Sequence, residues 1–349
     1  MIRPDAAAGG TRPRRAPGGI RTAGLIFIFL AGAACASNTR RSVVTEPLKT
    51  YYAGHYKFEL PETLRRDPDE IAKVRGLRIR SVTLPPAQTG EQSRKAFWKK
   101  YLDDLREKPR GYDEPRVIQE DEVRPGTPRV LYRGGHRLDR VVEVLLADDS
   151  HGVLIKTEWS NYGDEAEHTS AGPDARRVLT EVLAAHRFLP PGYAPADPAW
   201  FYLPAGAIAL PYSASDGGGE ENLEILFLDA GKERKFSLES VYPWQGRDSS
   251  KPGFMARVAQ TIGGWALGMR SIRTGHRTVA GFAGEEALLR SKTEDGEKLM
   301  FGWVYEPPEN APGFQPKIVI ELEAPATDLD GTLALWDQAL DRIKRISRD

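Results

Sequence analysis

The sequence has little of what several classes of protein require. It holds one cysteine, which excludes an internal disulfide framework and a cysteine-based zinc site. Its 49 basic and 49 acidic side chains cancel, so it lacks the basic surplus of a nucleic-acid-binding protein. The longest apolar stretch, residues 23–34, is shorter than the roughly 20 residues that a membrane-spanning helix needs. Composition therefore argues against these classes without naming an activity.

What is present indicates a folded protein. The chain is 40% hydrophobic and 9% aromatic, which is too apolar for a disordered chain. Its 349 residues exceed the length of about 250 to 300 residues at which a single hydrophobic core stops growing. Two domains are the expected organisation.

The amino end has the order of a secretion signal over residues 1–36. Arginines concentrate before residue 22, an apolar core follows at residues 23–34, and the sole cysteine, Cys35, stands directly after it. Two cleavage interpretations compete: residues 32–35 (GAAC) resemble a bacterial lipobox that ends in lipid attachment at Cys35, and residues 34–36 (ACA) suit the ordinary signal peptidase. The position of the only cysteine favours lipidation. In both cases the remaining chain leaves the cytoplasm, and the polar residues 37–50 are predicted to form a tether.

The body divides into two halves with similar patterns. Strand-like alternation, a helix, several further strands and a closing helix are predicted in residues 51–188 and again in residues 200–349. The proline-rich residues 189–199 can continue neither a helix nor a sheet ladder and are predicted to link the halves. The predicted helices lie at residues 93–108, 173–187, 254–265 and 329–343.

This order of elements predicts the α+β class. Strands that follow one another through short turns form antiparallel hairpins, and helices cover the apolar side of such a sheet. We therefore expect two similar domains, each a mainly antiparallel sheet with helices packed on one face.

The residue patterns of common catalytic and metal sites are absent. There is no G-x-S-x-G string, and the triple glycine at residues 217–219 precedes two glutamates that would repel a phosphate. The six histidines lack the spacing of a zinc site, and His151 follows Asp148 in what is predicted to be a solvated turn. Glu285 and Glu286 adjoin on a predicted strand and point to opposite faces. We expect no enzyme, no metal and no cofactor, although a secreted hydrolase with unrecognised catalytic residues stays open.

A partner-binding surface is the remaining hypothesis. An acidic run in a glycine-bounded loop could dock a partner, and aromatic side chains near predicted strand ends could anchor one, although core filling is their commoner use. The candidate partner-binding residues are Trp159, Tyr162, Asp164, Glu165, Glu167, Tyr242 and Trp244.

Short motifs in both halves resemble a known family. Residues 54–61 (GHYKFELP) are similar to the opening strand of immunity proteins against type VI secretion lipase effectors. Residues 275–286 (GHRTVAGFAGEE) resemble the central strand motif of that family, residues 254–257 (FMAR) its preceding helix, and residues 335–337 (LWD) its ending. The resemblance spans about residues 51–346.

The resemblance implies a periplasmic protein that binds a cognate phospholipase effector and prevents self-intoxication. It implies no catalytic residue and no cofactor, and membrane contact only through a lipid anchor at Cys35. The cleft between two similar domains is then the expected contact surface. The alternative is a generic envelope lipoprotein that binds a small molecule or an assembly partner.

Overall fold

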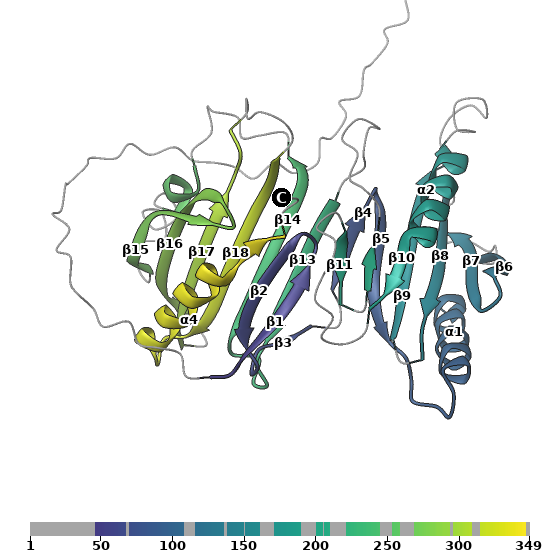
Figure 1. The fold of residues 1–349 in the computed structure, drawn as a ribbon, viewed down its shortest axis with the longest axis horizontal. Helices are drawn as coiled ribbons and strands as arrows, with labels where there is room; N and C mark the ends of the chain where they lie inside the picture. Colours follow the sequence, from purple (N-terminus) through teal and green to yellow (C-terminus); the bar gives the residue numbers. More distant parts are fainter. Residues whose placement is uncertain are drawn as a thin grey trace, which may run out of the picture. The chain divides into compact units, whose positions relative to one another are not determined.

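The computed structural model describes most of the chain beyond residue 45 (Figure 1). The secretion signal, Cys35 and residues 37–45 of the predicted tether lie outside the described residues. The end of that tether prediction is wrong, because strand β1 begins at Leu48, and Leu48 pairs with Pro61 in a hairpin. The described residues are 46–67, 70–107, 116–135, 138–149, 151–160, 171–189, 200–204, 206–209, 221–244, 253–258, 269–293, 296–308 and 315–346.

The helices and strands follow the predicted order with a few additions. The described helices are α1 (Gly90–Glu107), α2 (Ala171–Ala185) and α4 (Leu329–Arg342), with a helical turn at residues 254–258. The strands before residue 190 are β1 (Leu48–Ala53), β2 (Tyr56–Pro61), β3 (Arg65–Arg66), β4 (Ile71–Val74), β5 (Leu77–Thr83), β6 (Val117–Arg124), β7 (Thr127–Arg133), β8 (Asp139–Ala147), β9 (His151–Ser160) and β10 (His186–Phe188). Those after it are β11 (Phe201–Leu203), β12 (Gly206–Ile208), β13 (Glu221–Leu228), β14 (Lys235–Trp244), β15 (Met269–Val279), β16 (Phe282–Thr293), β17 (Gly296–Tyr305), β18 (Gln315–Pro325) and β19 (Lys344–Arg345).

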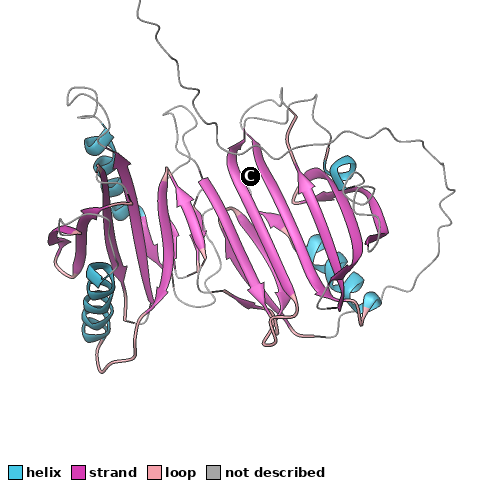
Figure 2. Cartoon of the chain, turned by 180° about the vertical axis from the view of Figure 1, so that it is seen from behind, coloured by secondary structure: helices cyan, strands magenta, loops and turns pink. Residues whose placement is uncertain are grey.

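One large antiparallel sheet runs through both halves of the chain (Figures 1 and 2). Its order is β15-β16-β17-β18-β14-β13-β4-β5-β9-β8-β7-β6, and short β3 pairs beside it with β13. The two halves meet where β13 pairs with β4, with Leu223 opposite Ala72. The prediction of mainly antiparallel sheet in both halves is confirmed. The proline-rich segment does not divide the sheet, and residues 39–349 form one compact unit.

The connections are the same on both sides of the β13–β4 pair. On one side the strands β4, β5, β9, β8, β7 and β6 follow one another, and on the other β13, β14, β18, β17, β16 and β15. Each side thus places its first two strands at the centre, returns its last strand beside them, and stacks the other three outward as hairpins. The pattern repeats although the sheet itself is continuous.

The helices lie on both faces of this sheet, so the prediction of helices on one face is wrong. Neighbouring residues of β8 contact helices on different faces, because successive side chains of a strand point to opposite faces of the sheet. Val141 packs in a small core with Leu102 and Leu105 of α1. Val142 and Val144 belong instead to the large core that contains Leu179 and Val182 of α2, and also Leu335, Trp336 and Leu340 of α4.

Two small sheets join segments from opposite halves. The opening hairpin β1–β2 pairs with β19, which follows the last helix, and β2 packs against α4. The hairpin β11–β12 pairs through β12 with β10, which follows α2. Backbone hydrogen bonds between Gly54 and Tyr202, of 2.8 and 2.9 Å, link the two small sheets. The opening hairpin was predicted to belong to the first half, and the structure places it against the end of the second.

Buried His186 in β10 makes stability depend on pH. Its ring is 7% exposed and lies edge-on to Phe188, with 4.6 Å between ring centroids. Burial, reinforced by the positive charges of Arg187 and Arg124, lowers the pKa of His186 from 6.5 to about 4. The unfolded chain binds a proton at the ordinary pKa, so stability is lost as the pH falls below about 6.5.

We therefore expect this histidine to cost the wild-type protein about 2 kcal/mol of unfolding free energy between pH 7 and pH 5. Urea denaturation of the wild type and of His186→Leu at both pH values measures it, because the leucine variant lacks this contribution. His276→Leu, which removes an exposed imidazole, is the control and should lose as much as the wild type. Equal losses in the wild type and His186→Leu would contradict the expectation.

Candidate functional site

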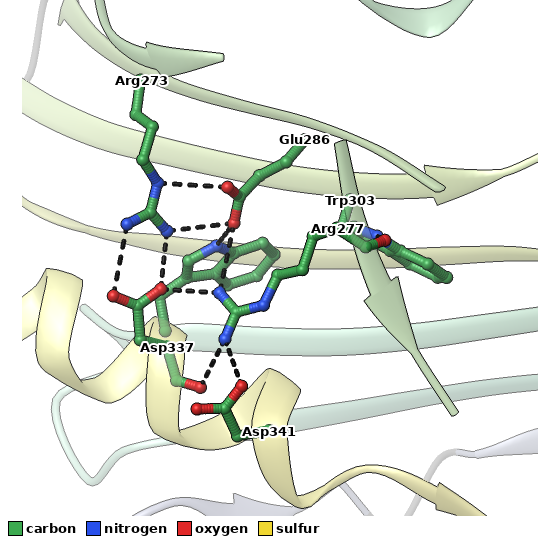
Figure 3. Close-up of polar contacts among 7 residues, drawn as sticks. Arg273, Arg277, Glu286, Trp303, Asp337 and Asp341 are labelled. Carbon is green, nitrogen blue, oxygen red and sulfur yellow. Dashed lines mark hydrogen bonds and ion pairs between the residues drawn. The ribbon is translucent and has the colours of Figure 1, made fainter. Parts of the chain in front are cut away.

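The motif residues of the second half form one polar network between β15, β16 and α4 (Figure 3). Arg273 donates to both carboxylate oxygens of Glu286, at 3.1 and 3.0 Å, and to Asp337 at 2.6 Å. Arg277 donates to Asp337 and to Asp341, each at 2.6 Å. Two arginines of one strand therefore bridge a buried glutamate to two aspartates one turn apart on the helix.

Two tryptophans complete this network. The indole N–H of Trp336 donates to Glu286 at 2.6 Å, and that of Trp303 donates to the carbonyl of Arg277 at 2.9 Å. Burial by itself would raise the pKa of Asp337, but hydrogen bonds from Arg273 and Arg277 bring it below its usual value. The carboxylate of Asp337 is thus held charged, and the carboxylates of Glu286, Asp337 and Asp341 all accept hydrogen bonds within the network, which is the arrangement of a structural anchor for α4.

The glutamate pair Glu285 and Glu286 separates as the strand geometry predicts. Glu285 accepts a hydrogen bond from the backbone N–H of Met255, at 2.8 Å, on the face that carries the helical turn at residues 254–258. Glu286 enters the network on the α4 face. The two carboxylates therefore cannot act together on one substrate.

The predicted partner-binding residues do not gather into one described surface. Tyr162, Asp164, Glu165 and Glu167 lie outside the described residues, and of Trp244 only the backbone, in β14, is described. Trp159 in β9 packs against the large core with the guanidinium of Arg176 over its ring, 5.8 Å from the centroid. Tyr242 is half-buried in β14, and three strands of the sheet separate it from Trp159.

His151 is the first residue of strand β9 and closes the polar turn that was predicted between β8 and β9. Its backbone N–H donates to the carboxylate of Asp148 at 2.7 Å, which is the local bond of a polar turn. Within the ranges that the structure describes, no group of three or more His, Cys, Asp or Glu side chains is arranged to hold a metal ion.

A second candidate surface was not predicted. On the five central strands β5, β4, β13, β14 and β18, alternate side chains are buried in the large core, and the side chains between them are exposed or half-buried. These intervening side chains form what we call the open face. Among the described residues, α1 and the turn at residues 254–258 pack on this side only toward its two ends. Its members include Arg78, Arg80, Ile71, Lys73, Asn222, Glu224, Leu226, Ser237, Glu239, Val319 and Glu321.

One row of directly paired residues crosses all five strands of the open face. Val319 lies opposite Glu239, Glu239 opposite Glu224, Glu224 opposite Ile71, and Ile71 opposite Arg80. Like charges directly opposite each other destabilise a sheet, and the Glu239–Glu224 pair is one such case. The second half therefore contributes acidic side chains to the row and the first half a basic one.

The acidic side chains of the open face lie close enough to repel one another. Partial burial and then the nearby charges of Glu239 and Glu323 raise the pKa of Glu321. Glu323 differs, because Lys298 donates to it at 2.6 Å and lowers its pKa. Within the part of the chain that the structure describes, Glu224, Glu239 and Glu321 have no ion-pair partner.

No protein-family model matches this sequence, and no curated protein is similar to it. Solved structures, however, share its fold over nearly their whole length. The apo structure of the immunity protein TplEi of the T6SS from Pseudomonas aeruginosa has a TM-score of 0.61 and 16% identity, over 86% of this chain and 98% of that one. A chain in the crystal structure of the Tle4–Tli4 complex has a TM-score of 0.62 and 15% identity, over 85% and 97%.

TplEi in complex with an "L" peptide gives a TM-score of 0.58 at 16% identity, over 86% of this chain and 99% of that one. This chain therefore shares its fold with solved immunity proteins of the type VI secretion system. The family that the motifs resemble and the proteins that share the fold thus agree. Residues 275–286 and 335–337, which carried the resemblance, converge on the network that holds α4 to the edge of the sheet (Figure 3).

Proposed function

We propose that this protein is a periplasmic immunity protein that binds a cognate type VI secretion phospholipase effector and inhibits it. The observation that carries the proposal is the fold shared with immunity proteins over at least 85% of this chain and 97% of theirs. The Tle4–Tli4 structure is a complex, which supports inhibition by binding. The motifs in both halves point independently to the same family.

The proposed mechanism needs no chemistry from this chain. The acidic and basic side chains of the motif region are paired with one another, since Glu286 and Asp337 both accept hydrogen bonds from arginine. Groups engaged in this way serve the packing of α4. Inhibition would follow if the sheet of this protein covered the surface through which the effector reaches its lipid substrate.

The place of action rests on the amino end of the sequence. Residues 1–36 have the order of a secretion signal, and Cys35 would carry a lipid if residues 32–35 act as a lipobox. An effector that attacks phospholipids from the periplasm would then meet its inhibitor there. The lipid, where attached, would be the contact with the membrane.

The two halves are proposed to be two similar domains. The repeated order of strands on both sides of the β13–β4 pair supports this, with α2 closing one half and α4 the other. The first hairpin of each proposed domain packs against the other domain. Hairpin β1–β2 of the first half packs against α4 of the second, and hairpin β11–β12 of the second half pairs with β10 of the first.

Protection of living cells tests the proposal. A type VI phospholipase effector from the same genome, directed to the periplasm, should lyse a host, and co-expression of the full chain with its signal should restore growth when that effector is the cognate one. A chain without residues 1–36 should fail to protect, because it stays away from the effector. Continued lysis despite stable, exported protein would contradict the proposal and favour the generic envelope lipoprotein.

The acidic loop and the aromatic residues remain a proposed contact surface as well. Charge reversal of Asp164, Glu165 and Glu167, combined with alanine at Tyr242 and Trp244, examines them in the same growth assay. Protection and binding that survive both changes would remove them from the interface.

A further inference from the structure

We propose that the open face docks the effector, and that its separated charges set the effector's orientation. The inference rests on the proposed function and adds the surface and the chemistry of the partner. The partner is a folded protein whose contact surface is basic where it meets β13, β14 and β18, and acidic where it meets β4 and β5.

The exposed charges of the open face are segregated by origin, whereas half-buried Lys235 and Lys317 on β14 and β18 are paired with Glu323 and Glu306. Glu224, Glu239 and Glu321 come from strands of the second half. Arg78 and Arg80, both exposed, come from β5 of the first half. The boundary between the two signs coincides with the β13–β4 pair, where the halves of the chain join. A partner whose basic and acidic regions are arranged in the complementary order would be attracted to both halves of the open face. The same partner bound in the reverse orientation would meet like charges on both halves.

An apolar side chain stands at that boundary. Ile71 is 41% exposed and lies directly between Glu224 and Arg80 in the transverse row. Half-buried Leu226 adds apolar surface on the neighbouring strand β13, and half-buried Val319 lies at the far end of the row, on β18. An apolar centre with charged surroundings is the anatomy of a specific protein interface.

The size of the face is adequate for such a partner. The five strands hold 40 residues in all, and at about 4.8 Å between strands and about 3.4 Å per residue they give a projected area of roughly 650 Å². Side-chain relief raises the accessible area above this value. A standard interface buries about 800 Å² per partner. The open face alone therefore supplies most of a stable contact.

The other exposed apolar feature considered, the outer strand β6, is less suited to docking a partner. The outer strand β6 exposes Ile118 and Val123, but its register shifts beside both residues and charged side chains stand between them. Bulges and charges of this kind protect a sheet edge from pairing. The open face combines segregated charge, apolar surface and sufficient area.

The test compares charge reversals with matched controls, using the full exported chain and the purified effector. Glu224→Lys/Glu239→Lys and Arg78→Glu/Arg80→Glu should each raise the dissociation constant by about 100-fold, because like charges then meet across the interface. Glu62→Lys/Glu107→Lys and Lys99→Glu/Lys232→Glu change exposed charges elsewhere by the same amounts and should bind as the wild type does.

The quadruple variant, which reverses the charges of Glu224, Glu239, Arg78 and Arg80 together, shows whether affinity depends on the arrangement of the charges or only on the net charge. Its net charge equals that of the wild type, yet the sign of each half is inverted, so it should bind more weakly than either double variant. Retained affinity in the quadruple variant would show that only overall charge matters and would overturn the proposal. Unchanged melting temperatures exclude misfolding as the cause.

A matched pair of isoleucines probes the apolar centre. Ile71→Ser should weaken binding by about tenfold, whereas Ile118→Ser, at 42% exposure, should have no effect. If the wild type binds the effector and every open-face variant binds equally well, the docking surface is elsewhere although the proposed function stands. If the wild type does not bind the effector at all, the proposed function fails first.

Discussion

Replacing Arg277 by methionine should lower the free energy of unfolding by about 3 kcal/mol. The side chain of Arg277 is 17% exposed and donates to Asp337, to its backbone carbonyl and to Asp341. Its loss would leave buried Glu286 and half-buried Asp337 with Arg273 as their remaining cation. Removing one member of a buried charge network costs about 3 to 5 kcal/mol, and the partial exposure of this one favours the lower end.

Urea denaturation gives the comparison. Arg177→Met is the control, because Arg177 pairs with Glu181 on the surface of α2 and such pairs contribute less than about 1 kcal/mol. Arg277→Lys should fall between the two, since an ammonium group cannot span both aspartates as the planar guanidinium does. A methionine variant as stable as the control would show that the network contributes little and that apolar packing alone holds α4.

Enlarging Gly284 should be comparably destabilising. A Cβ at this position would lie 2.4 Å from Cε2 of Trp303 and 2.5 Å from its Cζ2. Trp303 is fully buried and its indole N–H donates to Arg277, so the ring cannot move aside without breaking that bond. Overpacking a core costs about 1 to 3 kcal/mol, and we expect Gly284→Val at the upper end, near 3 kcal/mol.

The same motif supplies the matched control for Gly284. Gly275 lies on the adjacent strand β15, and nothing is within 4 Å of a Cβ built there. Gly275→Ala should therefore leave stability unchanged or raise it slightly, because alanine loses less backbone entropy on folding. Thermal unfolding of both variants decides. Equal melting temperatures would mean that Trp303 adjusts and that Gly284 is not required by packing.

The local structure was largely predictable from the sequence. The apolar spacing that predicts a helix over residues 329–343 matches α4, whose Leu335, Trp336 and Leu340 are buried and whose Asp328 caps the first turn. The helix predicted at residues 93–108 corresponds to α1, and the hairpin around Asp148 corresponds to β8 and β9. Very short strands, among them β4 and β19, were not predicted, because two to four residues are too few to show a hydrophobic period.

The candidate site was less predictable. Aromatic side chains near strand ends were predicted to anchor a partner, but Trp159 packs against the core, as large apolar side chains commonly do. Glu224, Glu239 and Arg80 looked like the ordinary polar side of separate strands. Their alignment in one row depends on pairing between β14, β13, β4 and β5, which no local pattern specifies.

The elements, the antiparallel hairpins and the family resemblance were predictable from the sequence, because side-chain periodicity, turn residues and motifs are all local features. The folded structure was needed to show that β13 joins β4 into one sheet, that α1 and α2 take opposite faces, and that β1–β2 packs beside α4. The first and the last of these arrangements join segments more than a hundred residues apart. Long-range pairing depends on which apolar surfaces and strand edges meet when the whole chain collapses, and that choice has no signature within any one segment.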